Sequence, residues 1–218
     1  MASSMAYSLR LIEDRLAAGA SAPVPRPGAP RVLYALSGTL LGEAATEPVP
    51  ALGPAGVTAR AGAEGARLYR VELVRQPPPP AGGRVLLEHS VDLVAGAAWL
   101  MRCDRVDFEP GGVAPPHRHR GGGIRCLLRG RLEVTVGEGA PRAVTPGEAW
   151  FESGRESVRA VSSREAETSF IRFSVLPADL RAHSSIVYVD PADAGRGRPR
   201  RYAVYVDEPI TLEPPCAC

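Results

Sequence analysis

Two histidines, His117 and His119, are separated by a single residue in a segment rich in proline and glycine. On a β-strand, residues i and i+2 project to the same face, so the two imidazoles can reach one cation. Iron, zinc, manganese and nickel are divalent metals that accept nitrogen ligands of this kind. The spacing therefore predicts a transition-metal site, and the alternative is a pair of surface histidines beside arginines.

The segments that must position these histidines are short and rich in β-forming residues. From residue 31 onward, runs such as 32–36, 99–108, 124–128 and 168–176 are separated by glycine and proline turns. Many short strands with this punctuation are typical of a β-sandwich or a β-barrel. We therefore expect an all-β fold around the two histidines.

The N-terminal residues follow a different pattern. Leu9, Ile12 and Leu16 recur at helical spacing, with charged residues between them and a glycine after them. This periodicity predicts a short amphipathic helix over residues 5–18. A proline-rich linker follows it and runs to residue 30.

Two pairs of segments repeat in the same order along the chain. Residues 32–40 match 124–132 as strand, glycine turn and strand, and residues 68–73 parallel 170–175. Matched segments in one order predict a duplicated β unit. The first copy contains no histidine, because His89 is the earliest in the chain. It therefore does not bind a metal through imidazole.

The region around the two histidines resembles the cupin family. The first cupin motif is matched as Gly-x5-His-x-His-x3-Gly-x6-Gly from Gly111 to Gly130, and residues 145–154 resemble the start of the second motif. The resemblance covers residues 100–176 well and residues 31–75 weakly. It implies a jelly-roll barrel that holds a metal through two histidines, a glutamate and a third histidine.

The resemblance also indicates how the chain is divided. We expect a helix and linker over residues 1–30, a degenerate cupin-like half unit over 31–83, a cupin jelly-roll barrel over 84–178, and strands with a tail over 179–218. The four prolines at 77–80 cannot join a sheet, so a boundary or a long loop is expected there.

Two of the four ligands that the resemblance implies are replaced in this chain. Gly123 stands at the glutamate position, and Ser157 or Val158 stands at the position of the third histidine. Only His117 and His119 therefore carry over as metal ligands. Two imidazoles alone do not make a tight site, so another side chain has to complete it.

Glu152 is our preferred third ligand, because its strand should pass beside the histidine pair. Two histidines and one carboxylate with open positions form the iron site of non-haem oxygenases. The alternative is a solvent-facing or ion-paired glutamate. Other candidates for the missing ligands are Glu148, Glu156, His89 and His183.

Arg125 is a second candidate for function. Residues 123, 125 and 127 share one strand face, and the resemblance implies that this face lines the barrel. A guanidinium there can bind a carboxylate or phosphate through two hydrogen bonds, but it also repels a metal cation. The alternative is an arginine at the barrel mouth, ion-paired to Glu148 or Glu152.

Three functions remain open on these residues. The first is a metal-dependent enzyme (an oxygenase, isomerase or cyclase) acting on a small molecule, with iron, zinc, manganese or nickel on His117, His119 and Glu152. Arg125 and Glu152 would then be its catalytic residues. The second is a non-catalytic barrel that binds a small anion, such as a carboxylate-bearing molecule, without a tight metal site. The third is a structural barrel filled by its own side chains, and fold alone does not decide among them.

Composition and charge exclude several partners. The 26 basic and 24 acidic residues leave a net charge of +2, which gives no reason to expect nucleic acid. No apolar run approaches the roughly 20 residues that cross a bilayer, and Glu13 and Asp14 interrupt any signal peptide. We therefore expect a cytoplasmic protein. Every basic residue is arginine, which suggests a bacterial genome rich in GC, and residues 123–128 also look like a bacterial cupin subgroup.

The remaining patterns concern assembly and cysteine chemistry. Both faces of residues 124–128 need cover from the degenerate first unit, from the helix at 5–18 or from another subunit, and we expect a homodimer. Cys103 and Cys126 lie in strand-like runs and are expected to be buried thiols. A terminal pair, Cys216 and Cys218, can bind soft metals but more often belongs to a disordered tail. The arginine-rich loop at 195–201 can contact phosphate but is more often a solvated turn.

Overall fold

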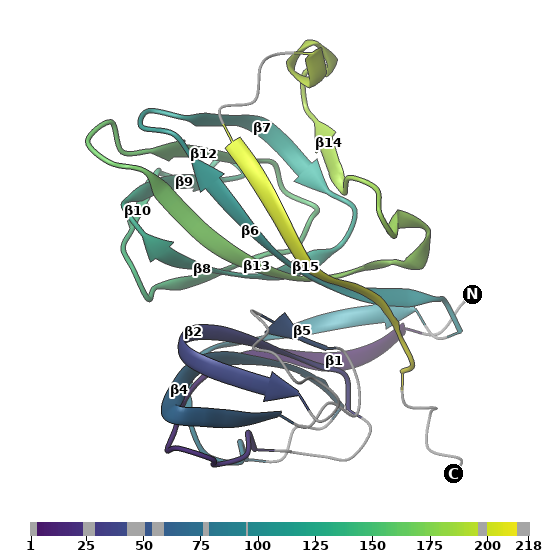
Figure 1. Ribbon diagram of the computed structural model, residues 1–218. Coiled ribbons are helices and arrows are strands. Elements are labelled where there is room, and N and C mark those ends of the chain that lie inside the picture. Colours follow the sequence, from purple (N-terminus) through teal and green to yellow (C-terminus); the bar gives the residue numbers. More distant parts are fainter. Residues whose placement is uncertain are drawn as a thin grey trace. The chain divides into compact units, whose positions relative to one another are not determined.

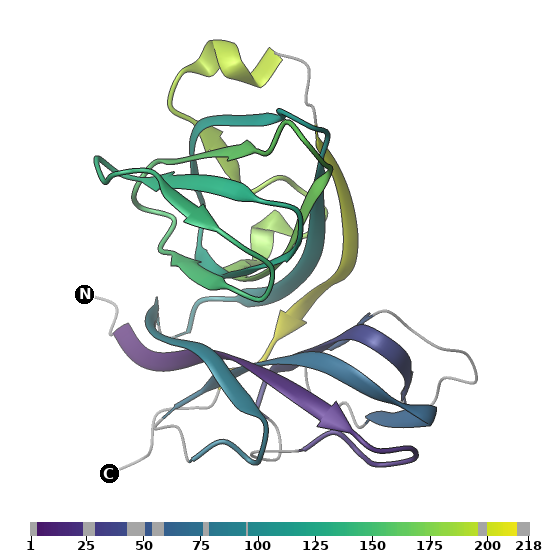
Figure 2. The same ribbon diagram turned by 90° about the vertical axis from the view of Figure 1, so that its left-hand side faces the viewer.

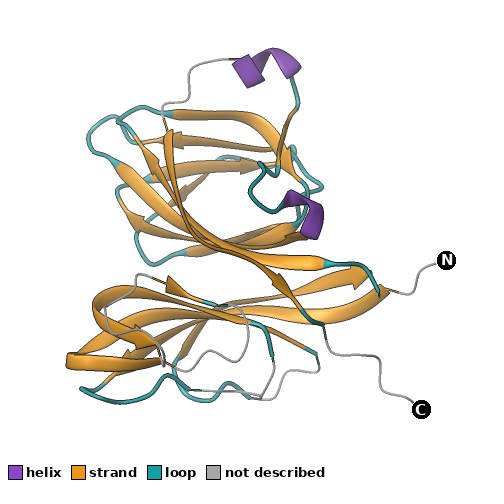
Figure 3. Ribbon diagram, turned by 45° about the vertical axis from the view of Figure 1, so that its right-hand side comes forward, coloured by secondary structure: helices purple, strands orange, loops and turns teal. Residues whose placement is uncertain are grey.

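The protein divides into two compact units in the computed structural model, which describes residues 4–23, 29–42, 51–53, 59–75, 79–94, 96–195 and 200–212. Unit 1 is formed by Met1–Met101 and Tyr205–Cys218, and unit 2 by Arg102–Val204. Nearly all regular structure is β-strand, with two short 3-10 helices (Figure 3). The all-β fold class is therefore confirmed. The described residues include no helix that is long and apolar enough to span a membrane.

Unit 1 contains one antiparallel sheet of five strands in the order β3-β2-β4-β1-β5 (Figure 1). Its strands are β1 (Ser4–Leu16), β2 (Arg31–Gly42), β3 (Ala51–Leu52), β4 (Ala59–Val74) and β5 (Arg84–Val94).

The predicted helix over residues 5–18 is wrong, because this segment is strand β1. It pairs with β4 from Ser8 opposite Val74 to Leu16 opposite Ala66. Leu9 and Ile12 are both fully buried although they lie on opposite faces of the strand. A strand with two buried faces shows no simple alternation, so its apolar residues happened to match a helical period.

Unit 2 is a jelly-roll barrel of two five-stranded sheets, which Figure 2 shows closing around a common interior. The sheet orders are β10-β9-β12-β7-β14 and β11-β8-β13-β6-β15. The elements are β6 (Trp99–Phe108), β7 (Val113–His119), β8 (Gly122–Arg129), β9 (Leu132–Val136), β10 (Arg142–Val144), β11 (Ala149–Glu152), β12 (Val158–Ser162), β13 (Thr168–Pro177), η1 (Ala178–Leu180), β14 (Ile186–Tyr188), η2 (Pro191–Gly195) and β15 (Arg200–Ile210).

The observed boundaries differ from the expected barrel over residues 84–178. Strand β5 pairs with β1, so residues 84–94 belong to the sheet of unit 1. Strands β14 and β15 extend the two sheets of the barrel, so the chain beyond 178 contributes to unit 2. Strand pairing across the chain decides these boundaries, and local composition does not reveal it.

The interior of unit 2 is apolar along most of its length. Phe108, Leu127, Trp150 and Phe170 are among the buried residues that pack together there. Both predicted buried thiols, Cys103 and Cys126, are buried. Ile124 and Cys126 are fully buried within the single chain, and the homodimer stays a prediction.

The internal repeat is reproduced in the register of the strands. Val32 and Val71 are Cα partners between β2 and β4, and their counterparts Ile124 and Phe173 are Cα partners between β8 and β13. The sheet orders β3-β2-β4-β1-β5 and β11-β8-β13-β6-β15 also correspond strand for strand. The sheet of unit 1 is therefore built like one of the two sheets of the barrel.

The glycine turn of the repeat has the same conformation in both copies. Gly38 and Gly130 have φ angles of +75° and +77°, which side-chain-bearing residues rarely adopt. A Cβ atom would lie 2.3 Å from the Gly65 carbonyl oxygen in the first copy and 2.6 Å from the Glu167 carbonyl oxygen in the second. Backbone packing therefore requires glycine at both turns.

Candidate functional site

The two histidines lie on β7 and present their rings to each other inside the barrel. The ring centroids of His117 and His119 are 4.9 Å apart, with the rings nearly perpendicular. Nδ1 of His117 lies 2.7 Å from the Pro115 carbonyl oxygen, which can only accept a hydrogen bond. Nδ1 of His119 lies 3.1 Å from the Ser185 hydroxyl. The proton of His117 is therefore on Nδ1, and its Nε2 carries a free lone pair.

Both imidazoles are held in the neutral form. Burial lowers the pKa of His117 below its ordinary value, although the bond to Pro115 acts in the opposite direction. Burial also lowers the pKa of His119, and the positive charge of Arg125 adds to the effect. Neutral imidazoles can accept hydrogen bonds or bind metals, which protonated ones cannot do.

Glu152 lies at the centre of the polar contacts, at the end of β11. Trp150 Nε1 donates a hydrogen bond of 2.8 Å to Oε1. Arg125 donates to Oε2 across 2.9 Å, and His119 Nε2 lies 3.5 Å from the same oxygen. Each carboxylate oxygen therefore accepts a hydrogen bond, and the Glu152 side chain is buried.

Arg125 is fully buried on the inward face of β8, as the resemblance implied. Its second terminal nitrogen donates to the Gly123 carbonyl oxygen at 2.6 Å. The guanidinium is thus fixed at one end by its own strand and at the other by Glu152. The structure brings together Arg125, His117, His119 and Glu152, the four site residues predicted from sequence.

The two replaced ligand positions lie directly opposite residues of this cluster. Gly123 is the Cα partner of Glu152 between β8 and β11, and Val158 is the Cα partner of His117 between β12 and β7. A Cβ atom on Gly123 would lie 2.2 Å from the Phe173 carbonyl oxygen, so no side chain fits there in this conformation. Directly opposite residues of paired strands share a face, so Glu152 supplies a carboxylate beside the position of the missing glutamate.

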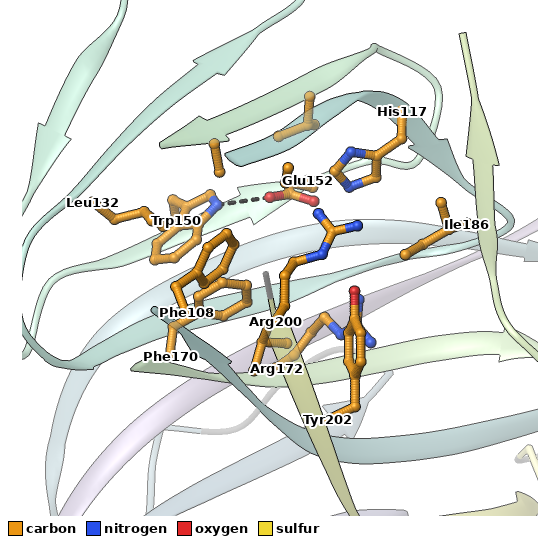
Figure 4. A pocket seen from close by; sticks show the side chains of 14 residues that line it. Phe108, His117, Leu132, Trp150, Glu152, Phe170, Arg172, Ile186, Arg200 and Tyr202 are labelled. Carbon is orange, nitrogen blue, oxygen red and sulfur yellow. Dashed lines mark hydrogen bonds between the residues drawn. The ribbon is translucent and has the colours of Figure 1, made fainter. Parts of the chain in front are cut away.

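A small cavity of about 30 Å³ opens beside these residues. Figure 4 shows Phe108, Trp150 and Phe170 together on one side of it. The other side is polar, and its lining residues include His117, Glu152, Arg172, Arg200 and Tyr202. A space of this size can accommodate a water molecule or a small group, and its two walls differ in polarity.

Arg172 is a buried cation that is paired with the carboxylate of Asp104. Its Nε donates to Asp104 Oδ1 at 2.8 Å, and a terminal nitrogen bonds the second carboxylate oxygen. Its guanidinium also lies 5.6 Å from the centre of the Tyr202 ring. Burial alone would lower the pKa of Arg172, but Asp104 outweighs burial and raises it. Arg172 is therefore a compensated charge in the cavity wall.

Arg200, at the start of β15, is a buried cation that forms no ion pair within the described ranges of the chain. The residue is only 7% exposed. One terminal nitrogen donates to the Tyr188 hydroxyl at 3.0 Å, and the guanidinium lies 6.0 Å from the centre of the Phe108 ring. Its Nε is buried without a hydrogen-bond partner. Figure 4 shows its guanidinium pointing toward the side chains of Glu152 and His117.

Sequence reasoning missed Arg200, because it was grouped with the arginine-rich loop at 195–201. Residues 196–199 of that loop lie outside the described residues, as do Cys216 and Cys218. Arg200 and Tyr202 both line the cavity, as residues i and i+2 of one strand can. The strand pattern from residue 200 onward was the signal that could have identified it.

As arranged, the residues do not fit a resident metal ion. No group of three or more histidine, cysteine, aspartate or glutamate residues is placed to hold one in the part of the chain that the structure describes. The carboxylate that would complete the histidine pair is bound to Arg125. The other candidate ligands named from sequence are exposed; they are Glu148, Glu156, His89 and His183.

Comparison with known proteins agrees with this fold. Residues 104–167 match the model of a family described as "Cupin domain". AerE from Microcystis aeruginosa is similar at 14% identity and a TM-score of 0.53, over 78% of this chain and 87% of that one. Oxalate decarboxylase from Bacillus subtilis is similar at 13% identity and a TM-score of 0.55, over 87% of this chain and 72% of that one. No curated protein sequence matches the chain.

Proposed function

This chain belongs to the cupin superfamily, and on that premise we propose that the barrel of unit 2 binds a small organic acid in its interior cavity. The observation that carries the proposal is the charge of Arg200. A buried cation without a carboxylate partner destabilises a protein by several kcal/mol unless an anion compensates it. A bound acid that supplies this anion would therefore gain a similar amount of binding free energy. The ligand carboxylate is assigned to the Arg200 guanidinium.

The charges around the cavity favour the binding of an anionic ligand. Arg125 is neutralised by Glu152, and Arg172 by Asp104. Both histidines are neutral near pH 7, because their pKa values are lowered. The described residues around the cavity therefore carry one positive charge in excess, that of Arg200. A single carboxylate balances it.

The shape and polarity of the cavity narrow the class of acid. The space of about 30 Å³ accepts only a small head group, which favours a short acid over a large one. His117 Nε2 has no proton and can accept a hydrogen bond from a hydroxyl group of the same ligand. The wall of Phe108, Trp150 and Phe170 suits an apolar substituent. We therefore propose a short carboxylic acid, with or without a hydroxyl group beside the carboxylate.

A metal-dependent enzyme that uses iron, zinc, manganese or nickel is the other candidate. It draws support from the neutral histidine pair and from the Mn(II) centres of Bacillus subtilis oxalate decarboxylase. It would require Glu152 to release Arg125, which would leave the buried Arg125 cation without a partner beside the metal ion. We therefore derive no reaction step through a metal, and we assign Arg125 and Glu152 to shaping the cavity.

Titration calorimetry with short acids tests the proposal. Acetate, glycolate, oxalate and benzoate are titrated into the metal-free protein, with benzamide as an uncharged analogue of benzoate. We expect at least one acid to bind and benzamide not to bind. In Arg200→Gln the affinity should fall roughly tenfold to a hundredfold, because a charge-assisted hydrogen bond is lost.

Arg201→Gln is the matched control, since the neighbouring side chain is 76% exposed. It removes the same charge from the protein without changing the cavity, so its affinity for the acid should equal that of the native chain. Arg200→Gln should also unfold at a higher temperature than the native chain without ligand, because it removes an uncompensated buried cation. Failure of all four acids to bind would favour a structural barrel and contradict the proposal.

A further inference from the structure

We propose that the Arg125 guanidinium takes the place of a metal ion in this barrel, and that removing it converts His117, His119 and Glu152 into a divalent-metal site. The guanidinium contacts the carboxylate that a metal would need, at 2.9 Å. The inference concerns the protein's own side chains and does not depend on the organic acid proposed above.

The donor atoms are already spaced for one ion. His119 Nε2 and Glu152 Oε2 are 3.5 Å apart. Two ligands bound tetrahedrally at about 2.1 Å from zinc lie roughly 3.4 Å from each other. The ring of His117 is beside that of His119, with a centroid separation of 4.9 Å. Three donors, two from β7 in one sheet of the barrel and one from β11 in the other, therefore converge on one region.

The contacts behind the imidazoles are those that orient metal-binding histidines. Histidine ligands usually donate their second ring nitrogen to a carbonyl or another polar group, which fixes the ring and its tautomer. His117 does so with the Pro115 carbonyl and His119 contacts the Ser185 hydroxyl. These bonds leave Nε2 of His117 without a proton, as metal binding requires. Burial also keeps both imidazoles neutral by lowering their pKa values.

The Glu152 carboxylate is paired with the Arg125 guanidinium instead of with a metal ion. Arg125 is held against Glu152 by its bond to the Gly123 carbonyl oxygen, so the guanidinium cannot swing away without breaking it. A metal ion and the guanidinium would then share one carboxylate oxygen in a buried site, where like charges repel strongly. The native protein should therefore exclude divalent metals.

The repeat indicates which substitution the strand tolerates. Leu33 occupies in unit 1 the position that Arg125 occupies in unit 2, since Leu33 pairs with Arg70 and Arg125 pairs with Arg172. Leu33 is fully buried. Leucine therefore fits this strand in this register, and Arg125→Leu is the variant of choice.

Metal uptake by native and variant chains tests the inference. Each protein is purified without an affinity tag, stripped with EDTA, and titrated with Zn(II), Mn(II) and Ni(II). Bound metal is measured by elemental mass spectrometry and by the shift in unfolding temperature. We expect no stoichiometric metal on the native chain and about one ion per chain on Arg125→Leu. Arg129→Leu, an exposed arginine at the end of the same strand, should behave as the native chain.

The site assignment is tested by a second substitution. Adding Glu152→Gln or His119→Ala to Arg125→Leu should abolish the uptake, because a ligand is lost. If Arg125→Leu does not fold, Arg125→Gln removes the charge but keeps a donor for Glu152, and the same uptake is expected. Stoichiometric metal on the native chain would overturn the inference. So would a folded Arg125 variant that takes up no more metal than the native chain.

Discussion

Arg125 and Glu152 form an ion pair in which the two side chains are 1% and 6% exposed. The pair joins neighbouring strands of one sheet, and each partner has a further anchor, Gly123 for the arginine and Trp150 for the glutamate. Removing one member of a buried pair leaves the other charge unpaired, which is much more destabilising than removing both. The energetics of the site should therefore be strongly non-additive.

A double-mutant cycle should reveal this coupling. In urea unfolding, we expect Arg125→Leu alone to lower the free energy of unfolding by about 3–5 kcal/mol. Arg125→Leu with Glu152→Gln should recover a large part of the loss, because the amide is neutral and can still accept the bond from Trp150. Additive losses in the double variant would show that the two side chains do not interact in solution.

The barrel, the histidine pair and Arg125 could be predicted from sequence because each depends on local spacing. His117 and His119 are i and i+2 on one strand, and Gly130 forms a turn that few other residues could form. The partners of Arg125 could not be predicted, because they come from strands whose register is set by long-range pairing. The same limit explains the predicted helix at 5–18, because this segment is strand β1 and its apolar residues are buried on both faces.

Arg200 shows a further limit of sequence reasoning. Its neighbours in the chain are arginine, glycine and proline, which favours a solvated loop. It is buried because β15, which starts 89 residues after Gly111 at the beginning of the histidine motif, joins the edge of a barrel sheet. No local pattern marks a charge as uncompensated, since that depends on which carboxylates lie nearby in space.

The stability of unit 2 should rise with pH between about 5 and 7.5. The pKa of His119 is lowered in the folded state by burial and by Arg125, whereas the unfolded chain has the ordinary value of about 6.5. As the pH falls through 6.5, His119 binds a proton in the unfolded chain but not in the folded chain, so the free energy of unfolding decreases. The charged or titratable groups near this ring are Arg125, Arg172, His117, Arg200 and Glu152.

Urea midpoints at pH 5.5 and pH 7.5 measure this dependence. His119→Asn should reduce the difference between the two midpoints, while His183→Asn, on an exposed turn, should leave it unchanged. An unchanged slope in His119→Asn would show that the ring does not contribute to the pH dependence.

The duplicated glycine turns should respond alike to substitution. Gly130→Ala places a Cβ atom 2.4 Å from Thr168 Oγ1, and Gly38→Ala places one 2.3 Å from the Gly65 carbonyl oxygen. Gly147 also has a positive φ, +88°, but a Cβ atom there meets nothing within 4 Å. We expect Gly147→Ala to cost about 1 kcal/mol of unfolding free energy, and the other two about 1–3 kcal/mol more because the backbone must move. Equal losses at all three positions would contradict the packing argument.

The two sheets of the repeat carry equivalent buried arginines, Arg70 and Arg172, each bound to an aspartate through two hydrogen bonds. The pairs differ in one respect. Arg70 also forms an ion pair with Glu72, whereas Asp104 is the carboxylate that pairs with Arg172 among the residues the structure describes. A charge that keeps one partner is less destabilising than a charge that keeps none.

Asp104→Asn should therefore destabilise unit 2 more than Asp14→Asn destabilises unit 1, although both changes preserve side-chain shape. We expect a loss of about 3–5 kcal/mol for Asp104→Asn, the range found when a buried ion pair is broken. Hydrogen exchange can measure each unit separately, through the amides of β13 for the first variant and of β4 for the second. Asp104→Asn also leaves a second uncompensated cation beside the cavity, so any short acid that binds the native chain should bind this variant more tightly. Equal loss of protection in both units, or weaker acid binding by Asp104→Asn, would show that these charges do not act as the structure indicates.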